Sequence, residues 1–232
     1  MRRNLTVTTK AIHEKEKNTM GFLDNLLNRA GSSLQSAVNS GTRRAVNQTM
    51  NEAEKMGNNA IRNMSKKKKE FTFSKIPENL EELKALPQAD LQDPFGVVAL
   101  VILAMNNYNK NLDNTIEMMN YLKGPSPLMG LELSRMRDQL AGKDYLMRSY
   151  FEGTSPENNY KPAEPFKLVI FDHPNSYDNE KDGYVTLWVN SSGADSDRQV
   201  RLRKKQSTGQ WFLNEEYLTP GIRTPKEADP WA

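Results

Sequence analysis

The sequence contains no cysteine and only two histidines, His13 and His173. Without cysteine there are no disulfides, thiolate nucleophiles or cysteine-ligated zinc sites, and two histidines give little material for acid–base chemistry. Long apolar runs are missing as well, because the longest, residues 97–105, is far shorter than the roughly 20 residues that cross a bilayer. These absences disfavour most familiar enzyme chemistries, and we expect neither a cofactor, nor a metal, nor a membrane-spanning helix.

Aromatic side chains and negative charge are both scarce in the first part of the chain. Residues 1–69 carry 14 Lys/Arg and 5 Asp/Glu, a net charge of +9, and Phe22 is their single aromatic residue. Residues 70–232 carry 18 Lys/Arg and 24 Asp/Glu, a net charge of −6, and hold the other 18 of the 19 Phe, Tyr and Trp. Since only the second part can build a large apolar core, we predict a basic arm and one globular domain over residues 70–232.

The first nineteen residues raise the question of where translation starts. Residues 14–17, Glu-Lys-Glu-Lys, imply a purine-rich run that resembles a ribosome-binding site, and Met20 opens a more coherent segment. We therefore interpret residues 1–19 as an upstream or disordered extension, with translation starting at Met1 or Met20. No apolar stretch follows Arg2 and Arg3, so a secretory signal is not indicated, and we expect a bacterial, cytoplasmic protein.

Residues 20–69 have an eleven-residue spacing of small and apolar side chains. Leu23, Leu34, Ala45 and Met56 recur at close to three helical turns and therefore share one face of a helix. Few apolar residues follow the first two turns, so this helix is weak in water on its own. We expect a basic amphipathic arm that serves localisation or self-association, with a partly disordered tail as the simpler alternative.

A second role for the arm is to fold on an anionic membrane surface at the inner face of the membrane. The side chains that would contact it are Phe22, Leu23, Leu26, Leu27, Leu34, Lys66, Lys67, Lys68 and Lys69. Nucleic acid is disfavoured, because the arm has no aromatic residues suited to base stacking apart from Phe22. A protein partner or a second copy of the chain is the expected partner.

The domain begins with predicted helices. Asp93-Pro94 is typical of a capped helix start, and the residues after it are apolar on nearly every side, which predicts a central buried helix over residues 97–105. A helix start is also indicated at Ser74, with Pro77 in its first turn and Pro87 after its end. Further helices are predicted over residues 111–123 and 128–140, and residues 144–151 are either a short helix or an edge strand.

Strands follow the prolines at positions 156, 162 and 165. Four strands are predicted over residues 166–172, 184–190, 199–205 and 210–214, and the short connections between them require antiparallel pairing. Val185, Leu187 and Val189 alternate with polar or larger residues, so one sheet face is apolar. The predicted fold class is α+β, with a helical cluster packed on a four-stranded antiparallel meander and the apolar face against the helix at 97–105.

The last third of the chain carries a family resemblance. The segments are Ser-Ser-Gly-Ala-Asp-Ser-Asp-Arg at 191–198, Val-Arg-Leu-Arg at 200–203, Gly-Gln-Trp-Phe-Leu at 209–213 and Gly-Ile-Arg at 221–223. Together they resemble an uncharacterised family of bacterial domains of unknown function over about residues 71–232, which implies no activity. The order of helices and then sheet also resembles the NTF2-like cone folds, although their sheet is usually interrupted by a helix, so we carry over no ligand pocket.

Asp172-His173 is the one place in the domain where an imidazole neighbours a carboxylate. The pair is typical of a general base with an orienting acid, but adjacent residues on a strand point to opposite faces and Pro174 follows, which favours a turn. The acidic residues Asp172, Asp178, Glu180 and Asp182 do not have the spacing of a calcium-binding loop and are interpreted as a solvated loop. We predict no catalytic residue.

The predicted interaction surface consists of Trp188, Arg198, Arg201, Arg203 and Trp231. A basic strip on one strand is usually solvated, yet it can also receive an acidic partner, and an exposed tryptophan often marks a binding surface. Residues 193–198 are predicted to form a hairpin connection. Its aspartate side chains are expected to accept hydrogen bonds from the turn backbone, and Arg198 is expected to pair with these aspartates.

These observations favour a non-enzymatic interaction module that carries a basic arm. The alternative is a small-ligand-binding or catalytic NTF2-like domain, whose pocket would lie between the helix at 97–105 and the sheet and would be lined by Asp172, His173 or by Arg135 and Arg137. A filled core and an exposed Trp188 would favour the interaction module, and a deep pocket would favour the alternative. The sequence does not indicate which small molecule such a pocket would bind.

Overall fold

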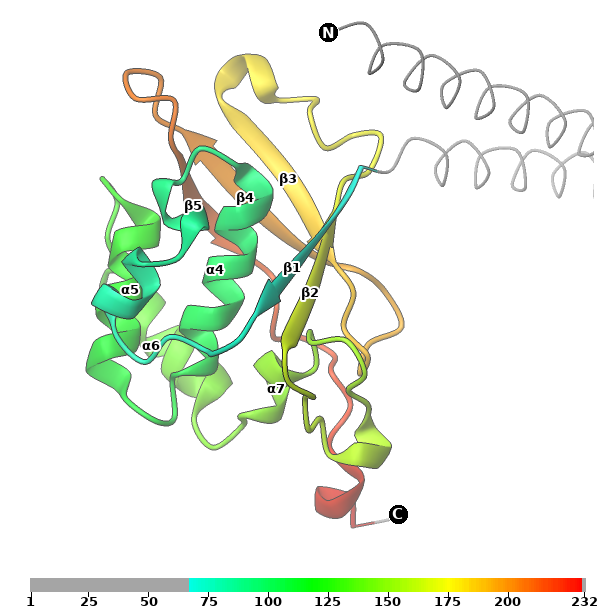
Figure 1. Cartoon of the computed structure of the whole chain (residues 1–232). Helices are drawn as coiled ribbons and strands as arrows, with labels where there is room; N and C mark the ends of the chain where they lie inside the picture. The colour runs from blue at the N-terminus through cyan, green and yellow to red at the C-terminus, as the bar shows by residue number, and fades with distance from the viewer. Residues whose placement is uncertain (1–66, 231–232) are drawn as a thin grey trace, which may run out of the picture. The chain divides into compact units, whose positions relative to one another are not determined.

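A computed structural model of the chain describes residues 67–230. The chain divides into two units, Met1–Ser65 and Lys66–Ala232, of which the second is the domain drawn in colour in Figure 1. The predictions for the arm up to Lys66 and for Trp231 fall outside the described residues.

A five-stranded antiparallel sheet is the framework of the domain. Its strands are β1 (Lys68–Phe73), β2 (Phe166–Phe171), β3 (Tyr184–Val189), β4 (Arg198–Lys204) and β5 (Trp211–Glu216). They lie in chain order, β1-β2-β3-β4-β5, so the predicted antiparallel meander is confirmed for β2 to β5. The predicted number of strands is wrong by one, because β1 was not expected.

β1 was missed because its lysines were assigned to the arm. The strand starts with exposed charged residues and ends at Phe73, which is buried, and it pairs with β2 from Lys68 opposite Phe171 to Phe73 opposite Phe166. It lies at one edge of the sheet. Charged side chains on an edge strand discourage pairing with other chains, which explains why a lysine run can belong to a strand.

The helices lie between β1 and β2 in the chain. They are α3 (Leu80–Lys84), α4 (Pro94–Asn106), α5 (Leu112–Lys123), α6 (Gly130–Leu140) and α7 (Tyr145–Arg148), with 3-10 turns η1 (Pro87–Asp90), η2 (Pro156–Asn158), η3 (Glu180–Asp182) and η4 (Lys226–Ala228). Residues 144–151 therefore contain the short helix and not the edge strand. Among the described helices, none combines the length and apolar character that a bilayer crossing needs.

The first helix starts later than expected. Asn79 caps α3 by accepting a hydrogen bond from the backbone N–H of Glu82 at 2.9 Å, so the helix begins at Leu80, beyond the start predicted at Ser74. The side chain of Glu82 in turn accepts from the backbone N–H of Glu78 at 3.0 Å. A carboxylate near the start of a helix satisfies N–H groups that have no partner within the helix, which fixes the start at Asn79.

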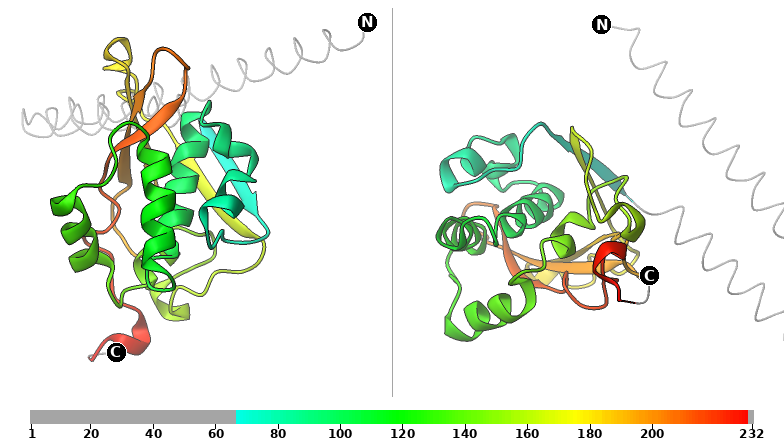
Figure 2. Two further views of the ribbon diagram at one scale, coloured as in Figure 1. Left: turned by 90° about the vertical axis from the view of Figure 1, so that its left-hand side faces the viewer. Right: turned by 90° about the horizontal axis from the view of Figure 1, so that it is seen from below.

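α4 is the core of the domain, as predicted. Asp93 accepts a hydrogen bond from the backbone N–H of Phe95, and Pro94 occupies the first helical position. Each residue from 97 to 104 is fully buried. Figure 2 shows α4 lying along the sheet with α5 beside it, and the inward residues Val185, Leu187 and Val200 complete the core.

Candidate functional site

On the sheet face turned away from α4, β3 and β4 place an aromatic ring beside two guanidinium groups. Tyr184 is the register partner of Arg203 and lies diagonally across from Arg201. The guanidinium carbon of Arg201 lies 4.4 Å from the centroid of the Tyr184 ring, and that of Arg203 lies 5.4 Å from it. Both are cation–π distances, each worth about 0.5–1 kcal/mol at an exposed site. The predicted basic strip therefore has an aromatic member, Tyr184, which was not among the predicted surface residues.

Trp188 lies on the same face, but it is half-buried. Its ring meets the ring of His173 edge-on at a centroid distance of 4.5 Å, and Phe171 is its register partner on β2. His173 also places Nε2 3.3 Å from Oδ2 of Asp197. Trp188 is thus a packing partner of the turn after β2, and most of its surface is covered.

Arg198 is engaged by the domain itself. Its Nε and Nη2 donate to the carbonyl of Pro220 at 3.0 and 2.7 Å, and its Nη1 donates to the carbonyl of Ser196 at 2.9 Å. Asp195 pairs with Arg223 at 2.8 Å. The prediction that Arg198 forms ion pairs with the loop aspartates is therefore wrong. Its guanidinium N–H groups donate instead to backbone carbonyls, chiefly that of Pro220 in the C-terminal segment.

The Asp172-His173 pair makes two separate sets of contacts. Asp172 Oδ1 accepts from the backbone N–H of Lys67 at 2.6 Å, and the backbone N–H of His173 donates to Ser176 Oγ at 2.9 Å. Burial, together with the nearby charge of Asp172, raises the pKa of Tyr177 to about 12. The carboxylate facing the imidazole is that of Asp197, which lies far along the chain. Within residues 67–230, no group of three or more His, Asp and Glu side chains is placed to hold a metal ion.

The lysines at the start of β1 contact the domain. Lys69 Nζ lies 2.9 Å from Asp93 Oδ1 and 4.9 Å from the centroid of the Phe95 ring, and Lys67 Nζ lies 5.6 Å from that of Tyr177. The Lys68 side chain is exposed. The prediction that Lys67, Lys68 and Lys69 contact a membrane stays a prediction.

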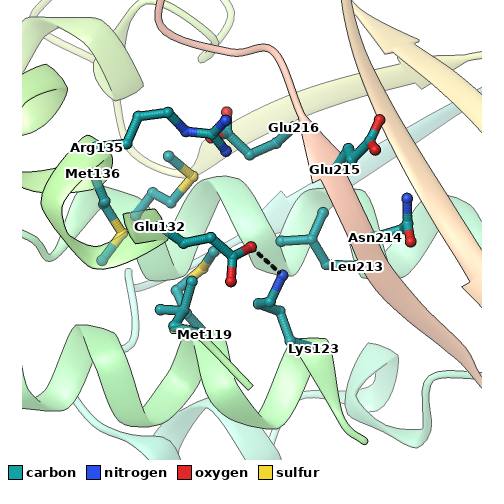
Figure 3. Close-up of a pocket in the computed structure, with 11 residues that line it drawn as sticks. Met119, Lys123, Glu132, Arg135, Met136, Leu213, Asn214, Glu215 and Glu216 are labelled. Carbon is teal, nitrogen blue, oxygen red and sulfur yellow. Dashed lines mark hydrogen bonds and ion pairs between the residues drawn. The ribbon is translucent and has the colours of Figure 1, made fainter. Parts of the chain in front are cut away.

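A small polar cavity lies where the end of α4 meets α5, α6 and β5 (Figure 3). Its volume is about 30 Å³, which suits one or two water molecules. The walls combine charged with apolar side chains, among them Lys123, Glu132, Arg135, Glu216, Met105, Met119, Met136 and Leu213. We call it the Lys123 cavity, because Lys123 is the buried charged residue in its lining.

Lys123 is the least exposed charged group of the cavity. Its side chain is 6% exposed, and Nζ lies 2.8 Å from Oε1 of Glu132. An ammonium group has three N–H donors, and this is the one side-chain hydrogen bond of Lys123 within the described part of the chain. Burial acts to raise the pKa of Glu132, but the hydrogen bonds from Lys123 and from the backbone of Met129 outweigh it, so the pKa is lowered.

The pKa of Glu216 is shifted in the opposite direction from that of Glu132. Burial raises the pKa of its carboxyl, against the hydrogen bond from the backbone N–H of Leu218 at 3.0 Å and the positive charge of Arg135. Figure 3 shows the side chain of Arg135 extending from α6 toward Glu216. The Lys123–Glu132 ion pair therefore links α5 to α6, and the charge of Arg135 on α6 acts on Glu216 of β5.

The ligand-binding alternative placed its pocket between α4 and the sheet. There α4 is packed without exposed residues from 97 to 104. Of the four residues named for that pocket, Arg135 lines the Lys123 cavity, Arg137 is exposed on α6, and Asp172 and His173 belong to the turn after β2. The structure does not bring these four residues together.

A shallower groove of about 330 Å³ lies between the end of α6, α7 and the C-terminal segment. It is lined by Tyr145, Ile222 and Thr219 together with the charged residues Asp138 and Lys143. The Tyr145 ring stacks on that of Tyr160 at 5.9 Å. No motif in the sequence indicated this groove, because its walls come from segments far apart in the chain.

The match to a family model covers most of the domain. The model of the family DUF6935, described as a domain of unknown function, matches residues 75–226, in agreement with the resemblance found in the last third of the sequence. No curated protein and no solved structure gives a significant match. The chain therefore belongs to the family DUF6935, a domain of unknown function.

Proposed function

We propose that the domain is a non-enzymatic interaction module that binds a protein partner through its surface. The observation that carries the proposal is the packing of α4, whose residues 97–104 fill the space on the inner face of the sheet. A pocket for a metabolite usually occupies roughly 300–1,000 Å³ and is lined by apolar residues. The Lys123 cavity, at about 30 Å³, is an order of magnitude smaller, and the groove of about 330 Å³ beside α7 is open to solvent and has the charged residues Asp138 and Lys143 in its lining.

Exposed apolar side chains at the start of α6 also support surface binding. Leu131 is 85% exposed and Met129 is 67% exposed, although single exposed apolar residues are common on protein surfaces. Neighbouring exposed apolar residues are more often found at sites of association. The domain thus offers two separate surfaces, the start of α6 and the outer face of β3 and β4.

In-cell photo-crosslinking tests the proposal. The photoreactive residue p-benzoylphenylalanine is placed in the full chain at Tyr184, at Leu131 or, as the control, at the exposed Lys181 in the native host. We expect a discrete protein adduct from Tyr184 or Leu131 that the control lacks and that excess unmodified chain suppresses. Equal yields of adduct from all three positions, or none from any, contradict the proposal.

The Lys123 cavity favours one second candidate, a site for a small amphipathic molecule. The specific observation is a buried ammonium group with one hydrogen bond, beside three methionines that can adapt their shape. Such a ligand needs α6 to move outward. Mass spectrometry of the purified full chain under native conditions tests this, since a bound molecule adds mass that Lys123→Met removes; an unchanged mass in both proteins excludes the candidate.

For the arm we propose localisation or self-association, on the basis of its sequence alone. Flotation of the full chain with anionic and neutral vesicles separates the two roles. Binding only to anionic vesicles, abolished by Leu23→Ser with Leu27→Ser, supports membrane localisation. A wild-type chain that stays unbound but forms dimers that the same substitutions disrupt supports self-association.

A further inference from the structure

We propose that the outer face of β3 and β4 binds an acidic segment of the partner protein, with Arg201 and Arg203 receiving its carboxylates beside the Tyr184 ring. The inference rests on the proposed interaction function and adds the site and the chemistry of the partner. Three features of the face support the inference. They are the position of the two guanidinium groups beside the Tyr184 ring, the absence of described ion pairs to them, and the presence of carboxylates near them.

The first feature is the support that Tyr184 gives to both guanidinium groups. A guanidinium held against an aromatic ring loses less side-chain entropy on binding, because part of its ordering is already present in the free protein. Its N–H groups lie in the plane of the group and match the two oxygens of a carboxylate. Arg201 and Arg203 lie two residues apart on β4, with their guanidinium carbons 4.4 and 5.4 Å from the ring centroid, and each can bind one carboxylate.

The second feature is that neither Arg201 nor Arg203 forms an ion pair within the described part of the domain. Ion pairs there involve the cations Lys69, Lys75, Lys123, Arg148, Lys167, His173 and Arg223, and do not include Arg201 or Arg203. Glu215 stands opposite Arg201 in the register of β4 and β5. Its Oε2 accepts from the hydroxyl of Tyr217 at 3.3 Å. An incoming carboxylate therefore does not have to displace an existing ion pair.

The third feature is the negative charge around the face, which favours a short acidic protein segment over a nucleic acid as the ligand. Residues 70–232 carry a net charge of −6, and the carboxylates of Glu215 and Asp197 lie at two borders of the face. A long, uniformly charged polyanion would be repelled by these groups, whereas a short segment places a few carboxylates on two guanidiniums. Phosphate binding usually relies on a larger basic patch.

Fluorescence anisotropy with a labelled hexaglutamate peptide and the full chain tests the inference. We expect saturable binding that weakens with added salt, and roughly fivefold or greater weakening by Arg201→Gln with Arg203→Gln, since bidentate charge-assisted bonds are lost. Arg201→Lys with Arg203→Lys keeps the charge but not the planar fork, so an intermediate affinity is expected. Hexaglutamine peptide should not bind.

The matched control is Lys181→Gln with Lys226→Gln, which removes the same charge from exposed positions on other segments. The control variant should keep the wild-type melting temperature, and Arg201→Gln with Arg203→Gln should lower it by only a few degrees, because it removes two cation–π contacts at side chains that lie at least partly in solvent. Equal weakening by the two variants would show nonspecific attraction and overturn the inference. Stronger binding of an oligonucleotide of equal charge, or no binding of hexaglutamate, would overturn it as well.

These results are distinguishable from a failure of the proposed function. If hexaglutamate does not bind but Leu131 gives a specific protein adduct in cells, the interaction function stands and the acidic partner at β3 and β4 is rejected. If neither position gives an adduct, the interaction function fails together with the inference.

Discussion

Gly193 lies at a point of close approach between the loop after β3 and two other segments. A Cβ at this position would lie 2.7 Å from Cγ2 of Ile222 and would also overlap the hydroxyl of Tyr160, which donates to the carbonyl of Arg223 at 2.8 Å. We predict that Gly193→Ala lowers the free energy of unfolding by about 1–3 kcal/mol, as overpacking does. Urea denaturation measures this.

Gly130 provides the control for that substitution. No heavy atom lies within 4 Å of a Cβ built on Gly130, and the residue is at the start of α6, where alanine is the better helix former. Gly130→Ala should therefore leave stability unchanged or raise it. A Gly193→Ala protein as stable as the wild type would contradict the close approach of Ile222 and Tyr160 to Gly193.

Glu216 gives a prediction of pH dependence. Burial raises its pKa in the folded state, so the protonated form contributes stability below the ordinary value of 4.5, and this contribution is lost as the pH rises through the folded-state pKa. Glu216→Gln should therefore be more stable than the wild type at pH 7 and lose this advantage near pH 4. Urea denaturation at the two pH values measures it, with the exposed Glu215→Gln as control. A constant difference between pH 4 and pH 7 would contradict the prediction.

Single residues differ in how far the sequence specifies them. The cap at Asp93 follows from local chemistry, since an aspartate before Pro-Phe is a strong helix start. The burial of Lys123 and Glu216 does not, because both side chains are charged and line a cavity whose other wall comes from α6. The partner of His173 was not predictable for the same reason: Asp197 is brought to it by the pairing of β2 with β3.

At the scale of elements, β1 tests whether the sheet has five strands. Phe73 is 3% exposed, whereas Thr72 faces solvent. We predict that Phe73→Ala costs about 3–5 kcal/mol of stability, because it removes a large side chain from the core, and that Thr72→Ala changes stability by less than about 0.5 kcal/mol. Chemical denaturation of both variants gives the comparison. Similar, small effects for the two would show that β1 is not part of the folded sheet.

The start of α4 allows a helix cap and an ion pair to be separated. Asp93 accepts from the backbone N–H of Phe95 at 3.2 Å and pairs with the half-exposed Lys69 at 2.9 Å. Asp93→Ala removes both contacts and should cost about 1–2 kcal/mol, whereas Asp93→Asn keeps a capping oxygen and should cost less than about 1 kcal/mol. Thermal unfolding measures both. Equal losses would assign the effect to the ion pair.

Elements were predictable where hydrophobic periodicity and turn residues agree. α4, α5 and the strands β2 to β5 have both kinds of pattern, and their positions were found within a few residues. β1 was missed because its lysine run resembles a solvated arm, and α3 was placed too early because Ser74 and Pro77 resemble a cap and a first turn. The pairing of β1 with β2 is a tertiary contact that the local pattern does not show, whereas the capping of α3 by Asn79 is a local contact that competes with the start signal at Ser74.

At the scale of the whole molecule, the sequence indicated the order of helices and sheet and the strand that carries the basic strip. The sequence did not indicate which arginines and lysines form ion pairs, because these pairs depend on contacts between segments that are far apart in the chain. Arg198 and Arg201 look equivalent in the sequence, yet the first binds carbonyls of the C-terminal segment and the second lies beside Tyr184. The surface available to a partner is therefore narrower than the sequence predicted.

The most direct test of the account is to map the binding surface by amide chemical shifts. The full chain, labelled with ¹⁵N, is titrated with hexaglutamate peptide. If this face binds acidic segments, the shift changes are concentrated at β3 and β4 and are largest at Tyr184, Arg201 and Arg203. Changes concentrated around Lys123 and α6, or no changes at all, would contradict it.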